Sequence, residues 1–212
     1  MYRDASNPFF IDLFNHFFVS LKAKRQHNNN YLYKLTIETK NLKLIPCDTE
    51  ILKSAIQGNK FIAEKLNVKV QDNWTEFGVG ALHYSLDKLL ESEEEKYWWT
   101  YFPIHKQDNK LIGSGGYKGK PATDGTVELG YEIAPAYRNR GLATEMTRGL
   151  IENAFKDDKV KSIIAHTLGQ ENASTKVLQK CGFEKVQEIN DPDDGLIWRW
   201  ELKKQITGSP NR

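Results

Sequence analysis

One segment of the chain joins a strand-like run to a helix-like run through a loop rich in arginine and glycine. The apolar alternation of Val127–Ile133 predicts a strand, and the apolar spacing of Gly141–Lys156 predicts a helix. Between them, Arg138–Ala143 reads Arg-Asn-Arg-Gly-Leu-Ala. The first backbone N–H groups of a helix have no partner within it, and they attract an anion such as a phosphate. The segment therefore predicts an anion-binding helix start in an α/β domain.

Two other phosphate-binding motifs do not fit the chain. Gly113–Gly116 comes nearest to the dinucleotide fingerprint, but it runs into Tyr117–Pro121, which does not have the pattern of a helix. Gly119 and Lys120 are followed by Pro121, where a nucleoside-triphosphate loop requires Ser or Thr. The anion-binding prediction therefore depends on the loop before Gly141–Lys156.

A second motif lies downstream, where Asn172–Ser174 is followed by Leu178–Phe183. With the Arg-x-x-Gly-x-Ala loop, it closely resembles the GNAT superfamily of N-acetyltransferases. Glu128–Tyr131, which reads Glu-Leu-Gly-Tyr, resembles the branch that contains the ribosomal-protein N-acetyltransferases. The resemblance covers about Tyr33–Lys203. It implies an α/β fold with a mixed, mostly antiparallel central sheet flanked by helices, the acyl-CoA N-acyltransferase fold.

Hydrophobic periodicity gives an element order that agrees with this fold. Asp48 is the expected N-cap of the first helix, and Pro103 predicts a bulge or an edge in the second strand. The expected strands are 42–44, 97–105, 110–118, 127–133, 160–168, 183–189 and 196–202. The expected helices are 49–58, 60–66, a longer one over Leu82–Leu90, 141–156 and 172–180.

The chain of 212 residues fits one domain with extensions. We expect residues 31–204 to form the N-acetyltransferase domain and residues 205–212 to form a flexible tail. Residues 1–30 are expected to form an N-terminal extension. It contains an aromatic stretch that could form a short helix, followed by a polar linker, and a poorly ordered extension is the alternative.

Composition argues against several classes of partner. There are 30 Lys and Arg residues against 28 Asp and Glu, a net charge of +2, so neither nucleic acid nor an anionic membrane is indicated. No run reaches the roughly 18 apolar residues of a membrane span, and the N-terminus lacks the pattern of a signal peptide. Cys47 and Cys181 have no disulfide or metal-site spacing. We therefore expect a cytoplasmic protein without a metal site; a homodimer is left open.

The resemblance implies that the cofactor is acetyl-CoA, the acetyl donor. It assigns the loop amides to the phosphates and the strand before the loop to the pantetheine arm, where the backbones of Tyr131, Ile133 and Ala134 would pair with it. The side chain of Asn172 would also contact the arm, although from local sequence it equally predicts a helix N-cap. The expected loop residues are Arg138, Asn139, Arg140, Gly141, Leu142, Ala143 and Thr144.

Three catalytic residues are expected. The Tyr131 amide would polarise the thioester carbonyl, and Glu128 would be the general base, with His166 on the neighbouring strand as the second choice. Glu128 and Glu132 share a face if their strand is regular. Some relatives use a tyrosine as general acid, but the matching position here is Leu178, so Ser174 would take this role through a hydrogen bond or a water. The alternative for Ser174 is a helix cap.

The sequence thus predicts direct acetyl transfer from acetyl-CoA to a primary amine in a ternary complex. The acceptor would be a protein N-terminus or a small-molecule amine, with antibiotic or polyamine acetylation as a further option. The alternative is a CoA-binding sensor or scaffold without activity, because the tyrosine acid is missing. An interaction role for the aromatic segment within residues 1–30 is a third hypothesis.

Overall fold

The computed structural model describes residues 36–205. The predicted extension, residues 1–30, and residues 206–212 of the predicted tail lie outside the described residues. The strands are β1 (Ile37–Glu38), β2 (Leu42–Pro46), β3 (Thr100–His105), β4 (Lys110–Leu111), β5 (Gly113–Tyr117), β6 (Thr126–Ile133), β7 (Ser162–Leu168), β8 (Glu184–Asp191) and β9 (Gly195–Lys203). The α-helices are α2 (Thr49–Gln57), α3 (Asn59–Leu66), α4 (Gly78–Glu91), α5 (Leu142–Ala154) and α6 (Ala173–Lys180), and two short 3-10 helices span Glu93–Trp98 and Pro135–Tyr137.

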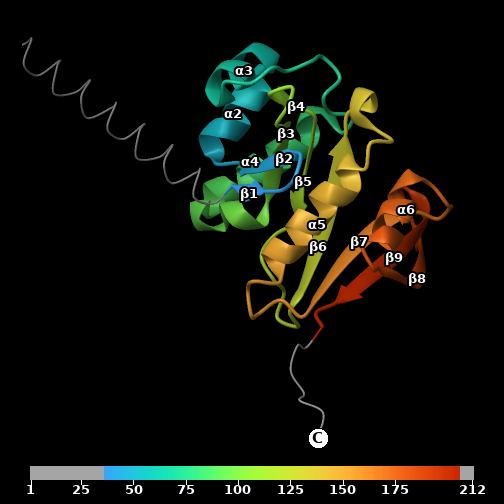
Figure 1. The fold of residues 1–212 in the computed structure, drawn as a ribbon. Coiled ribbons are helices and arrows are strands. Elements are labelled where there is room, and N and C mark those ends of the chain that lie inside the picture. The colour runs from blue at the N-terminus through green and yellow to red at the C-terminus, as the bar shows by residue number, and fades with distance from the viewer. Residues whose placement is uncertain (1–35, 206–212) are drawn as a thin grey trace, which may run out of the picture. The chain divides into compact units, whose positions relative to one another are not determined.

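The described strands form one sheet, in the order β1-β2-β3-β5-β6-β7-β9-β8, with β4 also paired to β3 (Figure 1). Every described pair is antiparallel except β6 and β7, which run parallel. The helix α5 connects these two strands, as a parallel crossover requires. The prediction of a mixed, mostly antiparallel sheet flanked by helices is confirmed.

Helices cover both faces of the sheet. On one face, Met146 and Leu150 of α5 pack in a buried cluster with residues from β2, β6 and β7. In β3, Tyr101 belongs to this cluster, whereas its neighbour Phe102 is fully buried outside it. Because successive side chains of a strand point to opposite faces, Phe102 faces the other layer, where Trp74 contacts it edge-on with ring centroids 5.2 Å apart. Figure 1 shows α2, α3 and α4 gathered at the β1–β5 end of the sheet and α6 at the β7–β9 end.

The parallel pair β6–β7 is short. Its register begins at Thr126↔Ser162 and ends at Glu128↔Ile164. Beyond that point β6 stays paired with β5 as far as Ile133, and β7 stays paired with β9 as far as Leu168. The two strands therefore separate after three residue pairs, and a gap opens in the middle of the sheet.

Most elements appear in the predicted order. Asp48 caps α2 as expected, and its carboxylate accepts the Ile51 N–H at 2.8 Å. Two differences are local. Tyr97 and Trp98, predicted to begin a strand, end the 3-10 helix Glu93–Trp98 instead. The two-residue strand β1 was not predicted, because two residues are too few to show a periodicity.

The predicted strand 110–118 is divided into β4 and β5. The register with β3 shifts by one residue between Tyr101↔Gly115 and Ile104↔Leu111. The extra residue lies in the partner segment 111–115, so the bulge is opposite Pro103 and not in its own strand; proline has no N–H to contribute to a regular ladder there. The bulge lies between β3 and the segment of β4 and β5, and β5 is the strand that pairs with β6 beside the gap.

Candidate active site

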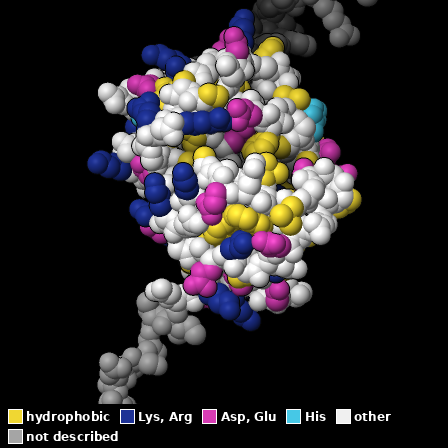
Figure 2. Space-filling model, turned by 90° about the vertical axis from the view of Figure 1, so that its right-hand side faces the viewer, with side chains coloured by type: hydrophobic (Ala, Val, Ile, Leu, Met, Phe, Trp, Pro, Cys, Tyr) yellow, Lys and Arg dark blue, Asp and Glu magenta, His cyan; other side chains and the backbone are white. Residues whose placement is uncertain are grey.

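A cavity of about 620 Å³ lies where β6 and β7 separate. Residues of α4, β3, β5, β6, β7 and α6 line it, among them the predicted site residues Glu128, Tyr131, His166 and Ser174. On the face shown in Figure 2, hydrophobic side chains form a band among interspersed basic and acidic side chains. The gap thus brings together side chains from elements that are far apart in the sequence.

The backbone of β6 presents alternate residues to the gap. The Lys118 N–H donates to the Glu128 carbonyl at 2.9 Å, and the Ala134 N–H donates to the Ile112 carbonyl at 2.8 Å. In an antiparallel pair, residues bonded to the neighbouring strand alternate with residues whose N–H and C=O point away from it. Residues 128, 130, 132 and 134 therefore bond toward β5, and Tyr131 and Ile133 direct their backbone groups toward the side where β7 has departed.

The loop after β6 ends at an uncapped helix start. Gly141 is the N-cap of α5 at φ 76° and ψ 0°, and no side chain caps the helix there. This left-handed conformation suits glycine, which has no Cβ to oppose it. Leu142 is buried beneath the loop, whereas Arg138, Asn139, Arg140 and Gly141 are exposed. The first-turn N–H groups at residues 142–144 are therefore open to an anion.

Both arginines of the loop have partners inside the protein. Arg138 donates from Nε to the Ile133 carbonyl at 2.9 Å, and its guanidinium also pairs with Glu76. Arg140 lies over the Tyr137 ring, 5.0 Å from its centroid.

The N–H of Ala134 donates to the Ile112 carbonyl, and the Ala134 carbonyl accepts from the Tyr137 N–H, so both backbone groups of Ala134 are used. Of the predicted strand residues, Tyr131 and Ile133 remain the ones whose backbones face the gap, and the Ile133 carbonyl already accepts from Arg138.

Glu128 and His166 meet at the cavity. The Glu128 carboxylate pairs with Lys118 and lies 3.1 Å from Nδ1 of His166. Burial by itself would raise the pKa of Glu128, but the hydrogen bonds from Lys118 and His166 outweigh it and hold the pKa below its ordinary value. A carboxylate with a lowered pKa is a weak base. The two residues that the sequence ranked as alternatives form one pair.

The start of α6 closes the cavity opposite β6. The Asn172 side chain accepts the Thr175 N–H at 3.0 Å and forms a capping box with it, so the predicted N-cap is present. The Tyr131 hydroxyl donates to the Ser174 carbonyl at 3.1 Å, which connects β6 with α6 across the gap. Burial raises the pKa of this hydroxyl above its ordinary value. Leu178, at the position of the missing tyrosine, lines the cavity with Ser174.

Comparison with known proteins identifies the fold. The family profile described as "Acetyltransferase (GNAT) domain" matches residues 57–184, more than half of the 212 residues. The chain belongs to this GNAT family. It is therefore an N-acetyltransferase of that family by relationship, as the motifs around Arg138–Ala143 and Asn172–Phe183 predicted.

Relatives agree with this GNAT assignment. The chain is 24% identical to uncharacterized N-acetyltransferase YjdG from Bacillus subtilis (strain 168), over 69% of this chain and 88% of that protein. The ribosomal-protein-S5-alanine acetyltransferase from Vibrio fischeri has a TM-score of 0.61 at 16% identity, covering 82% and 99% of the two chains. A ribosomal L7/L12 alpha-N-protein acetyltransferase, solved in complex with coenzyme A, has a TM-score of 0.59 at 13% identity, covering 79% and 97%. At these identities the solved structures show the fold.

Residues 36–205 contain no cluster of three or more His, Cys, Asp or Glu side chains that could hold a metal ion. In that range, no helix has the length and apolar character needed to cross a membrane.

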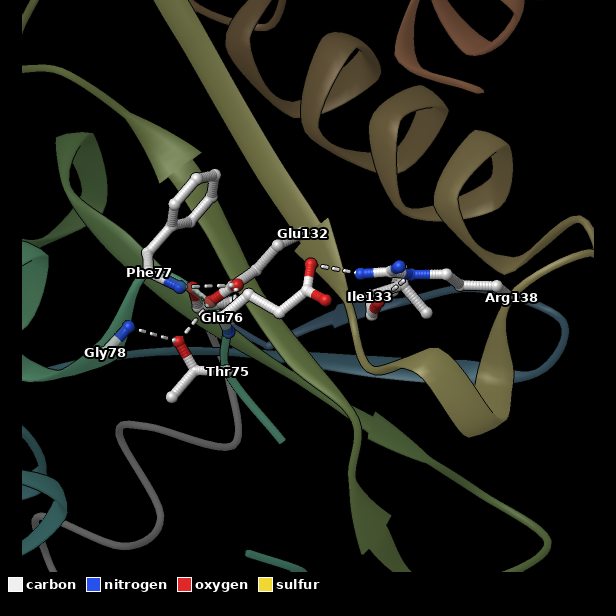
Figure 3. Close-up of polar contacts among 8 residues, drawn as sticks. Thr75, Glu76, Phe77, Gly78, Glu132, Ile133 and Arg138 are labelled. Carbon is white, nitrogen blue, oxygen red and sulfur yellow. Dashed lines mark hydrogen bonds and ion pairs between the residues drawn. The ribbon is translucent and has the colours of Figure 1, made fainter. Parts of the chain in front are cut away.

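The sequence did not reveal the role of Glu132, which is 8% exposed and accepts four hydrogen bonds. Two come from the hydroxyls of Thr75 and Ser114, at 2.6 and 2.7 Å. The other two come from the N–H groups of Glu76 and Phe77, at 2.8 and 3.2 Å. Figure 3 shows this carboxylate between β6 and the chain that enters α4, with the Glu76–Arg138 pair beside it. Glu132 therefore fixes the start of α4 to β6.

Replacing Glu132 should destabilise this GNAT domain more than replacing its neighbour in the network. Glu132→Ala leaves four donors without their acceptor, so we expect the free energy of unfolding to fall by about 3 kcal/mol. Glu76→Ala removes an exposed ion pair, and we expect less than about 1 kcal/mol. Urea unfolding followed by tryptophan fluorescence measures both. Equal losses for the two variants would contradict the role assigned to Glu132.

Proposed function

We propose that this protein transfers an acetyl group from acetyl-CoA directly to a primary amine within a ternary complex. The observation that carries the proposal is the separation of β6 from β7 after Glu128, which turns the backbone of Tyr131 toward a cavity of about 620 Å³ that this residue lines. The uncapped start of α5 follows the same strand. Membership in the GNAT family and the coenzyme A complex of a structural neighbour support acetyl-CoA as donor.

The residues present fit the cofactor. We assign its phosphates to the loop from Arg138 to Thr144, through the open N–H groups at the start of α5. We assign the pantetheine arm to the backbone of Tyr131 and to the Ile133 N–H. The family resemblance adds the side chain of Asn172, whose oxygen already accepts the Thr175 N–H. Ala134 would contribute packing alone, since its own N–H and C=O are used. When bound, acetyl-CoA supplies a thioester that an amine can attack.

Two groups would act on the reacting atoms. The Tyr131 N–H would donate to the carbonyl oxygen, where negative charge develops during attack. His166 would accept the proton of the amine: with its Nδ1 proton donated to Glu128, Nε2 carries the lone pair that takes the proton, directly or through a water. Glu128 would hold the ring and stabilise the imidazolium. This arrangement uses both residues that the sequence offered as bases.

Protonation of the leaving thiolate is assigned to the Ser174 hydroxyl, which lines the cavity. A serine hydroxyl is a poor acid, so it would act through a hydrogen bond or a bridging water.

The alternative function, a CoA-binding sensor or scaffold, is motivated by Leu178 in place of a tyrosine acid. Saturable CoA binding with no acetyl transfer to any amine would favour that alternative.

A charge introduced at Gly141 should weaken acetyl-CoA binding. Asparagine and aspartate have the same shape, and both tolerate the left-handed conformation of residue 141, where an added Cβ meets no atom within 4 Å. We expect Gly141→Asp to raise the Kd for acetyl-CoA at least about tenfold above that of Gly141→Asn, because its carboxylate repels the phosphates. Isothermal titration calorimetry measures both. No binding by the wild type, or equal Kd values for the variants, would argue against the assigned loop.

The pH dependence of acetyl transfer should report on the Glu128–His166 pair. A base must be deprotonated to work, so kcat/KM should fall as the pH is lowered, with an apparent value that belongs to the pair. We expect His166→Gln to lower kcat/KM by about 10² to 10⁴ and to remove this acidic limb. Glu128→Gln should lower kcat/KM less than His166→Gln does, because it removes the carboxylate that holds the ring and leaves the base in place.

The two bases are distinguished by the same profiles. If His166→Gln retains activity and Glu128→Gln abolishes it, then Glu128 is the base itself, as the sequence first ranked it.

A further inference from the structure

The side of the cavity next to α4 has a floor without side chains. Gly116 of β5 and Gly130 of β6 are cross-strand partners, so neither strand has a side chain at this point, and at Gly116 the Trp99 carbonyl occupies the place of a Cβ. A Cβ added at Gly130 would meet no atom within 4 Å, and Gly130 lines the cavity. Glu128 and Glu132 flank it on the same face of β6. A molecule that reaches the Tyr131 N–H from this side would pass over Gly130.

Aromatic rings form the wall above this floor. Phe77 is 65% exposed, Tyr84 is 57% exposed, and both line the cavity with Trp99. The rings of Tyr84 and Trp99 meet edge-on, with centroids 5.8 Å apart. Phe77 is held at its backbone by Glu132. Large exposed rings that face a cavity offer apolar surface to a ligand.

The charges on the lining are few and already paired. Among the lining residues, Lys118 and Glu128 carry formal charge, and they form an ion pair with each other. Glu132 is not among the lining residues, and its carboxylate already accepts four hydrogen bonds. A polycation needs several free carboxylates, because each of its ammonium groups must leave water. This lining has no free carboxylate for a polycation. An amine attached to an apolar group would instead bury that group against the aromatic rings.

We infer that the acceptor is a monoamine whose amino group stands next to a large apolar group, and that it enters over Gly130 with the apolar group against Phe77, Tyr84 and Trp99. This inference rests on the acetyl transfer proposed above. Two sources have this chemistry: a free arylalkylamine, and the α-amine of a peptide that begins with a large apolar residue.

An acceptor panel at saturating acetyl-CoA tests the inference, with CoA release measured by a thiol reagent. The panel contains phenethylamine, a peptide beginning with phenylalanine, the same peptide beginning with aspartate, and spermidine. We expect kcat/KM for phenethylamine or the phenylalanine peptide to exceed that for spermidine at least about tenfold. Whichever of these two acceptors has the higher kcat/KM identifies the source, a free arylalkylamine or a peptide α-amine. Spermidine or the aspartate peptide as the best acceptor would overturn the inference.

Substitutions at Gly130 test the route of entry. We expect Gly130→Ala to lower kcat/KM for the apolar acceptor several-fold and Gly130→Leu to lower it at least about tenfold, since both fill the floor. The Kd for acetyl-CoA, measured by calorimetry, should stay within about twofold. Gly80→Ala is the matched control, because Gly80 also has no atom within 4 Å of an added Cβ but lies on α4 outside the lining. It should change neither value.

Failure of this inference is separable from failure of the proposed function. Unchanged kcat/KM in Gly130→Leu, or no turnover of apolar monoamines by a protein that binds acetyl-CoA, overturns the acceptor assignment and leaves the cofactor site standing. Absence of acetyl-CoA binding by the wild type overturns the proposed function, and the acceptor assignment with it.

Discussion

The structure depends on a parallel strand pair that stops after three residue pairs. A sheet normally satisfies the backbone groups of its inner strands, and leaving them unpaired is costly unless a ligand or water bonds to them. Here β6 continues along β5 and β7 continues along β9, so the central strands turn their backbones toward a cavity. The Tyr131 hydroxyl bonded to α6 and the Glu132 carboxylate bonded to the start of α4 fix β6 on both sides of that opening.

Two glutamates on one face of β6 serve different purposes because their surroundings differ. Glu128 lies at the cavity with a lysine and a histidine, which keep it ionised and hold the imidazole. Glu132, four residues on, is enclosed by hydroxyl and amide donors and acts on the conformation of the chain that enters α4. Gly130 between them leaves open space. The alternation of a regular strand thus places a cavity carboxylate, a position without a side chain and a structural anchor in sequence along one face.

Much of this arrangement could be predicted from local patterns. The strand, loop and helix around Arg138–Ala143 and the cap at Asn172 follow from short-range rules of periodicity and capping. Relations between distant segments could not be predicted in this way. Nothing near Glu132 in the sequence indicates that Thr75 and Ser114 bind it, and nothing near Arg138 indicates that its guanidinium pairs with Glu76. The pairing of His166 with Glu128 depends on the register of β6 with β7, which the sequence pattern leaves open.

We propose that the gap between β6 and β7 receives the acetyl-bearing arm of acetyl-CoA. A crystal structure of the protein with acetyl-CoA tests it most directly. We expect the thioester oxygen within hydrogen-bond distance of the Tyr131 N–H, about 2.7 to 3.2 Å, and the diphosphate at the N–H groups of residues 142–144. A cofactor bound elsewhere, or strands β6 and β7 joined by hydrogen bonds beyond Glu128 in the complex, would contradict it.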